Sequence, residues 1–302
     1  MSAITPTNTD AARAPTGRKK PWSEQMRYVW YLSRRSPLTL VGTAIILLLV
    51  FIIITAPWIV PYNPDKVSLT ARLLPPSAAH WFGTDEVGRD LFSRVIYGSR
   101  ASCGAAFMIV LISMSVGVVI GCFSGVVGGR IDTGIMRLMD VIMALPALVL
   151  AMALAAALGP SLFNSMLAVA IVRIPAYVRL ARGQTLSLRE QLFVKASRTF
   201  GASPFYILRW HILPNVMSPI IVQSTLDLGS VVLIAAALSF IGLGAQPPTA
   251  EWGALVSSGR SYMLDQWWYA TFPGLAILLS AISCNLVGDG IRDMLDPRSR
   301  SR

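Results

Sequence analysis

Six segments of the sequence are long and apolar enough to cross a lipid bilayer as helices, since about 20 such residues span the hydrocarbon core. Their approximate bounds are 38–60, 101–127, 141–159, 161–180, 216–243 and 267–287. With 54% apolar and only 14% charged residues, the chain has too little charge to cover a soluble globule. The sequence therefore predicts an all-α membrane protein with six transmembrane helices.

The distribution of basic residues predicts the orientation of these helices, because loops rich in Lys and Arg stay in the cytoplasm. Of the 26 Lys and Arg residues, 20 lie in the N-terminal tail, after the second span, between 173 and 209, or in the C-terminal tail. We therefore expect both termini and the 182–215 loop to be cytoplasmic, and residues 61–99 and 245–266 to face outwards. This topology accounts for the formal charge of +11 without nucleic-acid binding.

Three regions follow from this pass along the chain. Residues 1–24 mix polar and basic residues without apolar periodicity, which is typical of a disordered cytoplasmic tail. Residues 25–99 contain an anchor helix and an outward-facing amphipathic segment, and residues 100–298 form a core of five transmembrane helices that carries the 182–215 loop.

The outward-facing segment is expected to include an amphipathic helix over residues 84–100. Val87, Leu91 and Val95 recur at four-residue spacing. Opposite charges stand at helical spacing in three pairs: Asp85 with Arg89, Glu86 with Arg89, and Asp90 with Arg94. His80 is expected in a loop that caps this helix, because no ligand spacing around it indicates a metal site.

Polar groups within the spans are candidates for function, because burying them in hydrocarbon is costly. Asp227 lies deep in the fifth span, near Gln223. It either lines a water-filled path or pairs with a neighbouring helix. Arg173 and Pro175 in the fourth span predict an irregular helix that faces a cavity.

The stretch "FVKASRTFGASPFYILRWHILPN" (193–215) is unusually basic and polar for its position between two apolar spans. Ser203 and Pro204 predict a helix start, with Ser as N-cap and Pro at the first helical position. Gly201 can end the preceding helix in a left-handed conformation. We expect the next helix to run from Pro204 to about Ile212 and to stop ahead of Pro214.

This short helix is rich in apolar and aromatic residues, namely Phe205, Tyr206, Leu208 and Trp210. That composition is typical of the core of a protein interface. The alternative is an amphipathic helix that lies on the lipid headgroups.

The same stretch resembles the "EAA" loop of permease subunits of ATP-binding-cassette (ABC) importers. The family pattern is Glu-Ala-Ala, three residues, Gly, nine residues, Ile, one residue and Leu-Pro. The matching positions here are Lys195, Ala196, Ser197, Gly201, His211, Leu213 and Pro214. The spacing, the Gly and the Leu-Pro are kept, whereas Lys195, Ser197 and His211 depart from the pattern.

Three further stretches narrow the resemblance to the dipeptide, oligopeptide and nickel branch, and to the second, C-type permease of its pair. They are "HWFGTDEVGRDLFSRVIYGSR" (80–100), "LSFIGLGAQPPTAEWGAL" (238–255) and "FPGLAILLSAISCNLVGDGIRDMLDPR" (272–298). The resemblance covers residues 25–298 and implies the type I ABC importer permease fold in a bacterial inner membrane.

The resemblance also implies the partners and the roles of residues. In the family, the EAA loop is a coupling helix that docks on a separate ATPase; the complex contains a second permease, two ATPases and an external binding protein. The coupling positions implied here are Lys195, Ala196, Ser197, Gly201, Ser203, Pro204, Phe205, Tyr206, Leu208, Leu213 and Pro214. Candidates for the translocation path are Asp227, Gln223 and Arg173.

The expected function is thus uptake of di- or oligopeptides as half of the transmembrane path. Nickel or another small solute is the alternative cargo. The chain has no Gly-x-x-x-x-Gly-Lys-Ser/Thr phosphate loop, so ATP is expected on the partner subunits, and no cofactor, metal or catalytic residue is expected here. An ion-driven secondary transporter is a weaker alternative, since the sequence shows no inverted repeat.

Overall fold

The computed structural model describes residues 37–295, and this part of the chain is built of helices without a strand. The N-terminal tail and the basic residues before the first span lie outside these residues. The longer helices are α2 (Pro37–Ile59), α3 (Leu91–Val127), α4 (Gly129–Met143), α5 (Ala147–Leu158), α6 (Leu162–Arg189), α9 (Leu213–Phe240) and α11 (Trp268–Leu295). Shorter elements are α7 (Leu192–Thr199), α8 (Pro204–Ile207), α10 (Trp252–Gly259), the π-type turn η2 (Leu208–Ile212) and the 3₁₀ turns η1 (Leu69–Ala71) and η3 (Arg260–Tyr262).

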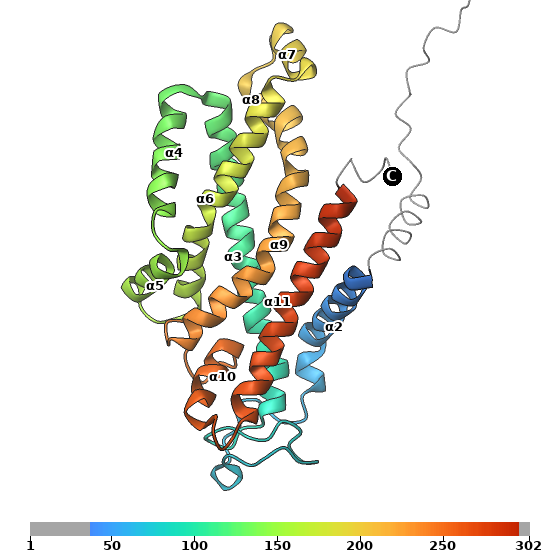
Figure 1. Cartoon of the computed structure of the whole chain (residues 1–302), viewed down its shortest axis with the longest axis vertical. Helices are drawn as coiled ribbons and strands as arrows, with labels where there is room; N and C mark the ends of the chain where they lie inside the picture. Colours follow the sequence, from blue (N-terminus) through green and yellow to red (C-terminus); the bar gives the residue numbers. More distant parts are fainter. Residues whose placement is uncertain (1–36, 296–302) are drawn as a thin grey trace, which may run out of the picture.

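The long helices run side by side, and the connecting segments gather at two ends of the bundle (Figure 1). At one end α7 and α8 project beyond the other helices; we name this the α7 end. At the opposite end lie α10 and the irregular segment between α2 and α3, and we name this the α10 end. Each end therefore offers a distinct surface on one side of a membrane.

Among residues 37–295, five helices are long and apolar enough to cross a membrane, or six if α4 and α5 count as one span. The third predicted span, residues 141–159, contains a bend of 91° between α4 and α5, and it counts as a span only when these two helices are taken together. The break falls at Leu145, which precedes Pro146, and a residue before proline is disfavoured in the α conformation. The other predicted spans correspond to α2, α3, α6, α9 and α11.

The tightest seam of the bundle joins α3 to α6 through small residues. Gly117, Gly121 and Gly125 stand four residues apart on α3 and face α6. A Cβ atom added at Gly121 would lie 2.4 Å from the carbonyl oxygen of Val178, so only glycine allows the two backbones to approach this closely. α6, the helix that precedes α7, is thereby held firmly against α3.

The predicted amphipathic helix over residues 84–100 was wrong in its first part, because α3 begins only at Leu91. Gly88 adopts φ +78, which the right-handed helix does not allow. Asp85 instead organises a turn, accepting hydrogen bonds from the backbone N–H of Val87 (3.0 Å) and Arg89 (2.8 Å). The charge spacing that suggested a helix is used within a loop.

Asp90 is the N-cap of α3, where its side chain accepts from the Ser93 N–H at 2.8 Å. Its other oxygen lies 2.9 Å from His80 Nδ1, so His80 does lie in a loop at the helix start. The expected pair of Asp90 with Arg94 is replaced by this contact, and Arg94 turns to other partners.

The fifth span is longer than predicted, because Pro214 does not stop the helix that begins at Pro204. α8, η2 and α9 follow one another without a break from Pro204 to Phe240. In the widened turn, the N–H of Leu213 donates to the oxygen of Leu208, five residues back. This wider turn accommodates the proline ring that would clash in a regular α-helix. The fourth span, which was expected to be irregular, forms one helix that continues through Pro175 without a break.

Candidate functional site

The projecting part of the chain at the α7 end comprises α7, the short connection from α7 to α8, and α8 with η2 (Figure 1). We name residues 192–212 the α7–α8 segment. Val194, Ile207 and Ile212 are its buried side chains, and they pack into one apolar cluster with Tyr177 of α6 and Val216 of α9. The segment is thus anchored on two long helices although it projects from the bundle.

Gly201 forms the joint between α7 and α8, as its sequence position predicted. Its φ is +81, in the left-handed region. Its N–H donates to the oxygen of Arg198 (2.9 Å), and the N–H of Ala202 donates to that of Ser197 (3.0 Å). These two bonds are those of a Schellman cap, which satisfies the last carbonyls of α7 and fixes the direction of the exit.

The start of α8 also follows the prediction. Ser203 is the N-cap, and its hydroxyl accepts from the N–H of Tyr206 at 3.2 Å. Pro204 stands at the first helical position, where the missing N–H leaves no bond unmade. Joint and cap together fix the direction in which α8 leaves α7, and the buried side chains of Val194 and Ile207 support the same arrangement.

Five aromatic side chains of the α7–α8 segment are exposed, and Phe193 is one of them. The exposed fractions of Phe200 and Phe205 are 90% and 74%, and Tyr206 and Trp210 are exposed too. The predicted coupling residues did not include Phe200, although its position directly before Gly201 could have indicated an exposed aromatic side chain at the joint. Leu208 and Leu213 behave differently, since they are half-buried and pack against the apolar cluster. The aromatic residues therefore face outward from a fixed base.

Two contacts involve the three positions that depart from the family pattern. Lys195 Nζ lies 3.0 Å from a carboxylate oxygen of Glu190, and this ammonium group holds the pKa of Glu190 below its ordinary value. Ser197 Oγ lies 3.1 Å from His211 Nε2, so two of the departures contact each other. Ala196 is exposed on the same helix.

The polar residues of the fourth and fifth spans meet in the middle of the bundle. Asp227 of α9 is 6% exposed, and its Oδ1 lies 3.1 Å from the guanidinium of Arg173 on α6. Tyr177 donates its hydroxyl proton to Oδ2 at 3.2 Å, and Ser230 donates to Oδ1 at 3.0 Å. Asp227 was expected either to line a water-filled path or to pair with a neighbouring helix, and the structure shows it paired with α6 of the same chain. Gln223, one turn away, is half-buried.

Two ion pairs that the sequence did not predict attach α4 to α6. Arg182 donates from Nε to one oxygen of Asp132 (2.5 Å) and from a terminal nitrogen to the other (2.6 Å), which is a bidentate geometry. Arg179 donates to Asp140 at 2.5 Å, nearer the bend to α5. The polar face of the bent pair is therefore turned toward α6.

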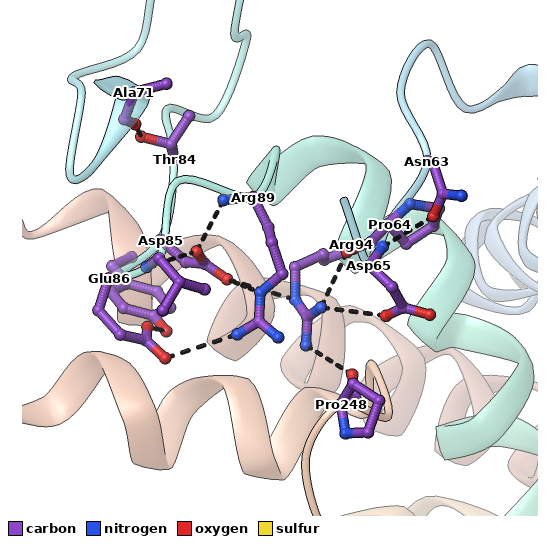
Figure 2. Close-up of polar contacts among 12 residues, drawn as sticks. Asn63, Pro64, Asp65, Ala71, Thr84, Asp85, Glu86, Arg89, Arg94 and Pro248 are labelled. Carbon is purple, nitrogen blue, oxygen red and sulfur yellow. Dashed lines mark hydrogen bonds and ion pairs between the residues drawn. The ribbon is translucent and has the colours of Figure 1, made fainter. Parts of the chain in front are cut away.

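At the α10 end, the buried Asp85 is the centre of a charged network (Figure 2). Arg89 Nε donates to Asp85 Oδ2 at 2.6 Å, and its terminal nitrogen lies 3.5 Å from Glu86. Glu86 also accepts a hydrogen bond from the hydroxyl of Tyr269 on α11. The turn before α3 is thereby tied to the last span.

Arg94 extends this network across the surface (Figure 2). Its guanidinium donates to the carbonyl oxygens of Pro64 (2.9 Å) and Pro248 (3.2 Å) and lies 3.5 Å from Asp65. Two loops that are far apart in the sequence are thus joined by one arginine, which is 3% exposed.

Comparison with known proteins identifies the family. Residues 117–301 match the binding-protein-dependent transport system inner membrane component family. Residues 24–76 match the N-terminal transmembrane domain of oligopeptide transport permease C.

Similar proteins are named as permeases of peptide or glutathione transport systems. The probable D,D-dipeptide transport system permease protein DdpC of Escherichia coli (strain K12) is 60% identical over 273 residues, which are 90% of this chain and 91% of the relative. The di/tripeptide transport system permease protein DppC of Pseudomonas aeruginosa (strain UCBPP-PA14) is 46% identical, covering 86% and 88%. The glutathione transport system permease protein GsiD of Escherichia coli O6:K15:H31 is 42% identical, covering 93% and 91%.

The all-helical architecture, the projecting α7–α8 segment and these matches agree with one another. Members of this family are membrane permeases and not catalytic subunits. The chain therefore belongs to the inner-membrane permease components of binding-protein-dependent ABC importers, in the branch of oligopeptide transport permease C.

Proposed function

We propose that this permease forms half of a transmembrane path for short peptides and that a separate ATPase drives it by binding the α7–α8 segment. The observation that carries the proposal is the exposure of Phe200, Phe205 and Trp210 on a segment whose base is buried. Exposed aromatic residues on a rigid support are suited to fill pockets on a partner.

The partners follow from this division of labour. The sequence has no phosphate loop, so two ATPase subunits would supply ATP hydrolysis, and a homologous second permease would supply the other half of the path. An external substrate-binding protein would deliver the peptide to the α10 end. No cofactor is required on this chain.

The orientation in this proposal rests on the basic residues. The α7 end carries Lys195, Arg198 and Arg209, and it would face the cytoplasm together with both termini. The α10 end would face outwards. The ATPases and the binding protein would then act on opposite ends of one bundle.

The continuity from α8 to α9 suggests how movement reaches the path. A tilt imposed on α8 would pass directly into α9, because no loop separates them. α9 carries Gln223 and Asp227, and Asp227 is paired with Arg173 of α6. We place these three residues at the border of the path, where closing of the ATPase pair would shift α9 relative to α6 and expose the path alternately to each side.

For the cargo, the names of three relatives point the same way. They are described as carriers of D,D-dipeptides, of di- and tripeptides, and of glutathione, all of which are short peptides or peptide-like compounds. The shared chemistry is a small molecule with a free ammonium and a free carboxylate group. We therefore propose short peptides as the substrate class, in preference to nickel.

Reconstitution tests this function. The permease pair, the ATPases and the binding protein from the same organism would be placed in liposomes, and ATP-dependent uptake of radioactive dipeptides and of radioactive nickel would be measured. Dipeptide uptake that requires both ATP and this chain supports the proposal. Uptake of nickel without dipeptide, or dipeptide uptake without this chain, would contradict it.

A further inference from the structure

An open cavity of about 600 Å³ lies at the α10 end, between α2, α3 and the loop before α10. Its walls include Ile53, Asp65, Tyr97, Arg100, Pro248 and Thr249. A volume of several hundred Å³ is typical of small-molecule sites. The cavity lies apart from the α7–α8 segment and from the pair of Arg173 and Asp227.

Two walls of this cavity are fixed by the buried arginine described above. Arg94 is bonded to the carbonyl oxygens of Pro64 and Pro248 and lies 3.5 Å from Asp65, and Figure 2 shows these groups converging on one guanidinium. Asp65 and Pro248 both line the cavity. Its shape is therefore set by the protein and does not depend on a ligand.

The cavity is lined by one acidic and one basic side chain. The side chain of Asp65 is 57% exposed, so its carboxylate remains accessible despite the long contact with Arg94. Arg100 is exposed, and its guanidinium lies 5.5 Å from the ring centroid of Tyr97. Within residues 37–295, Arg100 has no hydrogen bond or ion pair to a protein group. A ligand with an anionic and a cationic group would satisfy both charges.

The depth of the cavity places it at the membrane surface. Ile53 stands six residues before Ile59, the last residue of α2, which corresponds to about 9 Å along the helix. The exposed Trp58 near this end is an aromatic residue of the kind that marks the headgroup level. From this depth a long arginine side chain reaches the interface.

An apolar track leads from the cavity along α3. Tyr97 and Arg100 share a face with Gly104, Phe107 and Leu111, which follow at helical spacing and are all exposed. A Cβ atom added at Gly104 would meet no atom within 4 Å, so the helix surface is open there. The track runs from the cavity toward the middle of the membrane and is apolar beyond Arg100, as an acyl chain requires.

We propose that this cavity binds the headgroup of phosphatidylethanolamine, with the phosphate on Arg100, the primary ammonium on Asp65 and an acyl chain along Phe107 and Leu111. Phosphatidylglycerol has a phosphate but no cation, so Asp65 disfavours it. A quaternary choline has no N–H to donate to the carboxylate. A dipeptide carries a similar pair of charges, but the membrane-level opening and the apolar track favour a lipid.

Lipid titration of the purified full-length chain tests the site. The delipidated protein in detergent would be titrated with phosphatidylethanolamine and with phosphatidylglycerol of the same acyl chains, and bound lipid would be measured by native mass spectrometry. We expect Arg100→Gln to weaken phosphatidylethanolamine binding about tenfold, because a charge-assisted contact is lost. Asp65→Asn is expected to abolish the preference over phosphatidylglycerol. Arg72→Gln and Asp265→Asn, which alter exposed charges that do not line the cavity, are the matched controls.

Thr249→Trp supplies a second variant, which fills the cavity without changing charge and is expected to reduce phosphatidylethanolamine binding as well. Equal binding of the two lipids by the unaltered protein, or unchanged binding in both Arg100→Gln and Thr249→Trp, would overturn the proposal. Millimolar alanyl-alanine is added in a further titration, because this soluble dipeptide also carries one anionic and one cationic group. Displacement of the lipid by this dipeptide, with dipeptide binding lost in Arg100→Gln, would assign the cavity to a peptide and also overturn it.

Discussion

Ser197 and His211 contact each other across the Gly201 joint, with 3.1 Å between the serine hydroxyl and the imidazole Nε2. Ser197 lies on α7 and His211 on η2, so the contact ties the projecting helix to the start of the fifth span. Both residues replace apolar ones in the EAA pattern. Each of these polar side chains is a hydrogen-bond partner of the other, so we expect the two replacements to be tolerated only together.

Exchange of this pair tests that dependence. Either Ser197→Ala or His211→Ile alone is expected to loosen α7 by about 1 kcal/mol, because one polar partner is left without its bond. The double variant, which restores the family residues, is expected to be close to the unaltered protein. Limited proteolysis of the α7–α8 segment measures the loosening. Additive losses in the double variant would show that the two residues act independently.

Substitution at the joint tests the role of backbone conformation. Gly201→Val is expected to strain the joint by about 1 to 2 kcal/mol, since a β-branched residue resists φ +81. A Cβ atom at this position would meet no atom within 4 Å, so the effect is conformational and not a clash. Gly201→Asn is the matched control, because asparagine tolerates the left-handed region. We expect uptake to fall in the Val variant and to be largely retained in the Asn variant. Equal uptake by both variants would show that transport does not depend on the left-handed conformation at residue 201.

Removal of the charge at Asp227 tests the interior pair. Asp227→Asn leaves Arg173 without its counterion and is expected to destabilise the protein by about 2 to 3 kcal/mol, at the low end for such pairs because Arg173 keeps some exposure. Adding Arg173→Met should recover much of this loss, as measured by thermal unfolding in detergent. If these residues border the path, both variants transport poorly yet still co-purify with the second permease. Loss of co-purification would instead assign the pair to assembly.

Cysteine labelling tests the orientation. In a background without the three native cysteines, Ser258→Cys at the α10 end should react with an impermeant thiol reagent added outside intact cells, whereas Ala196→Cys at the α7 end should not. Both positions are exposed, so a difference in labelling reports sidedness. Labelling of residue 196 but not 258 would invert the topology.

Apolar length and local capping signals were sufficient to predict most spans and the joint at Gly201. These features depend on residues close in sequence. Gly201 and Pro204 act through their own backbone, and the hydroxyl of Ser203 bonds a backbone N–H only three residues on, so these features could be anticipated without knowledge of the fold.

The errors arose where distant contacts or backbone detail decide the outcome. The charges at 85–89 fit a helix by spacing, but Gly88 and the hydrogen bonds of Asp85 build a turn that packs on the rest of the α10 end. The π-type turn before Pro214 has no reliable sequence signature. Likewise, the partners of Asp132 and Arg94 come from other helices and loops, which sequence spacing does not reveal.

Binding of the ATPase to the α7–α8 segment is the most direct test of the account. Phe205→Ala is expected to weaken the interaction by about 1 to 3 kcal/mol if the ring fills a pocket on the ATPase. The matched control is Phe163→Ala at the start of α6, because the exposed fractions of the two rings are similar, 67% for Phe163 and 74% for Phe205. The measurement is the affinity of the ATPase for the reconstituted permease pair, with peptide uptake followed in parallel. The account predicts weaker ATPase binding and lower uptake for Phe205→Ala, and no change in either for the control Phe163→Ala. Unchanged affinity and uptake for Phe205→Ala and for the corresponding Phe200→Ala would contradict it and would favour a segment that rests on the lipid headgroups.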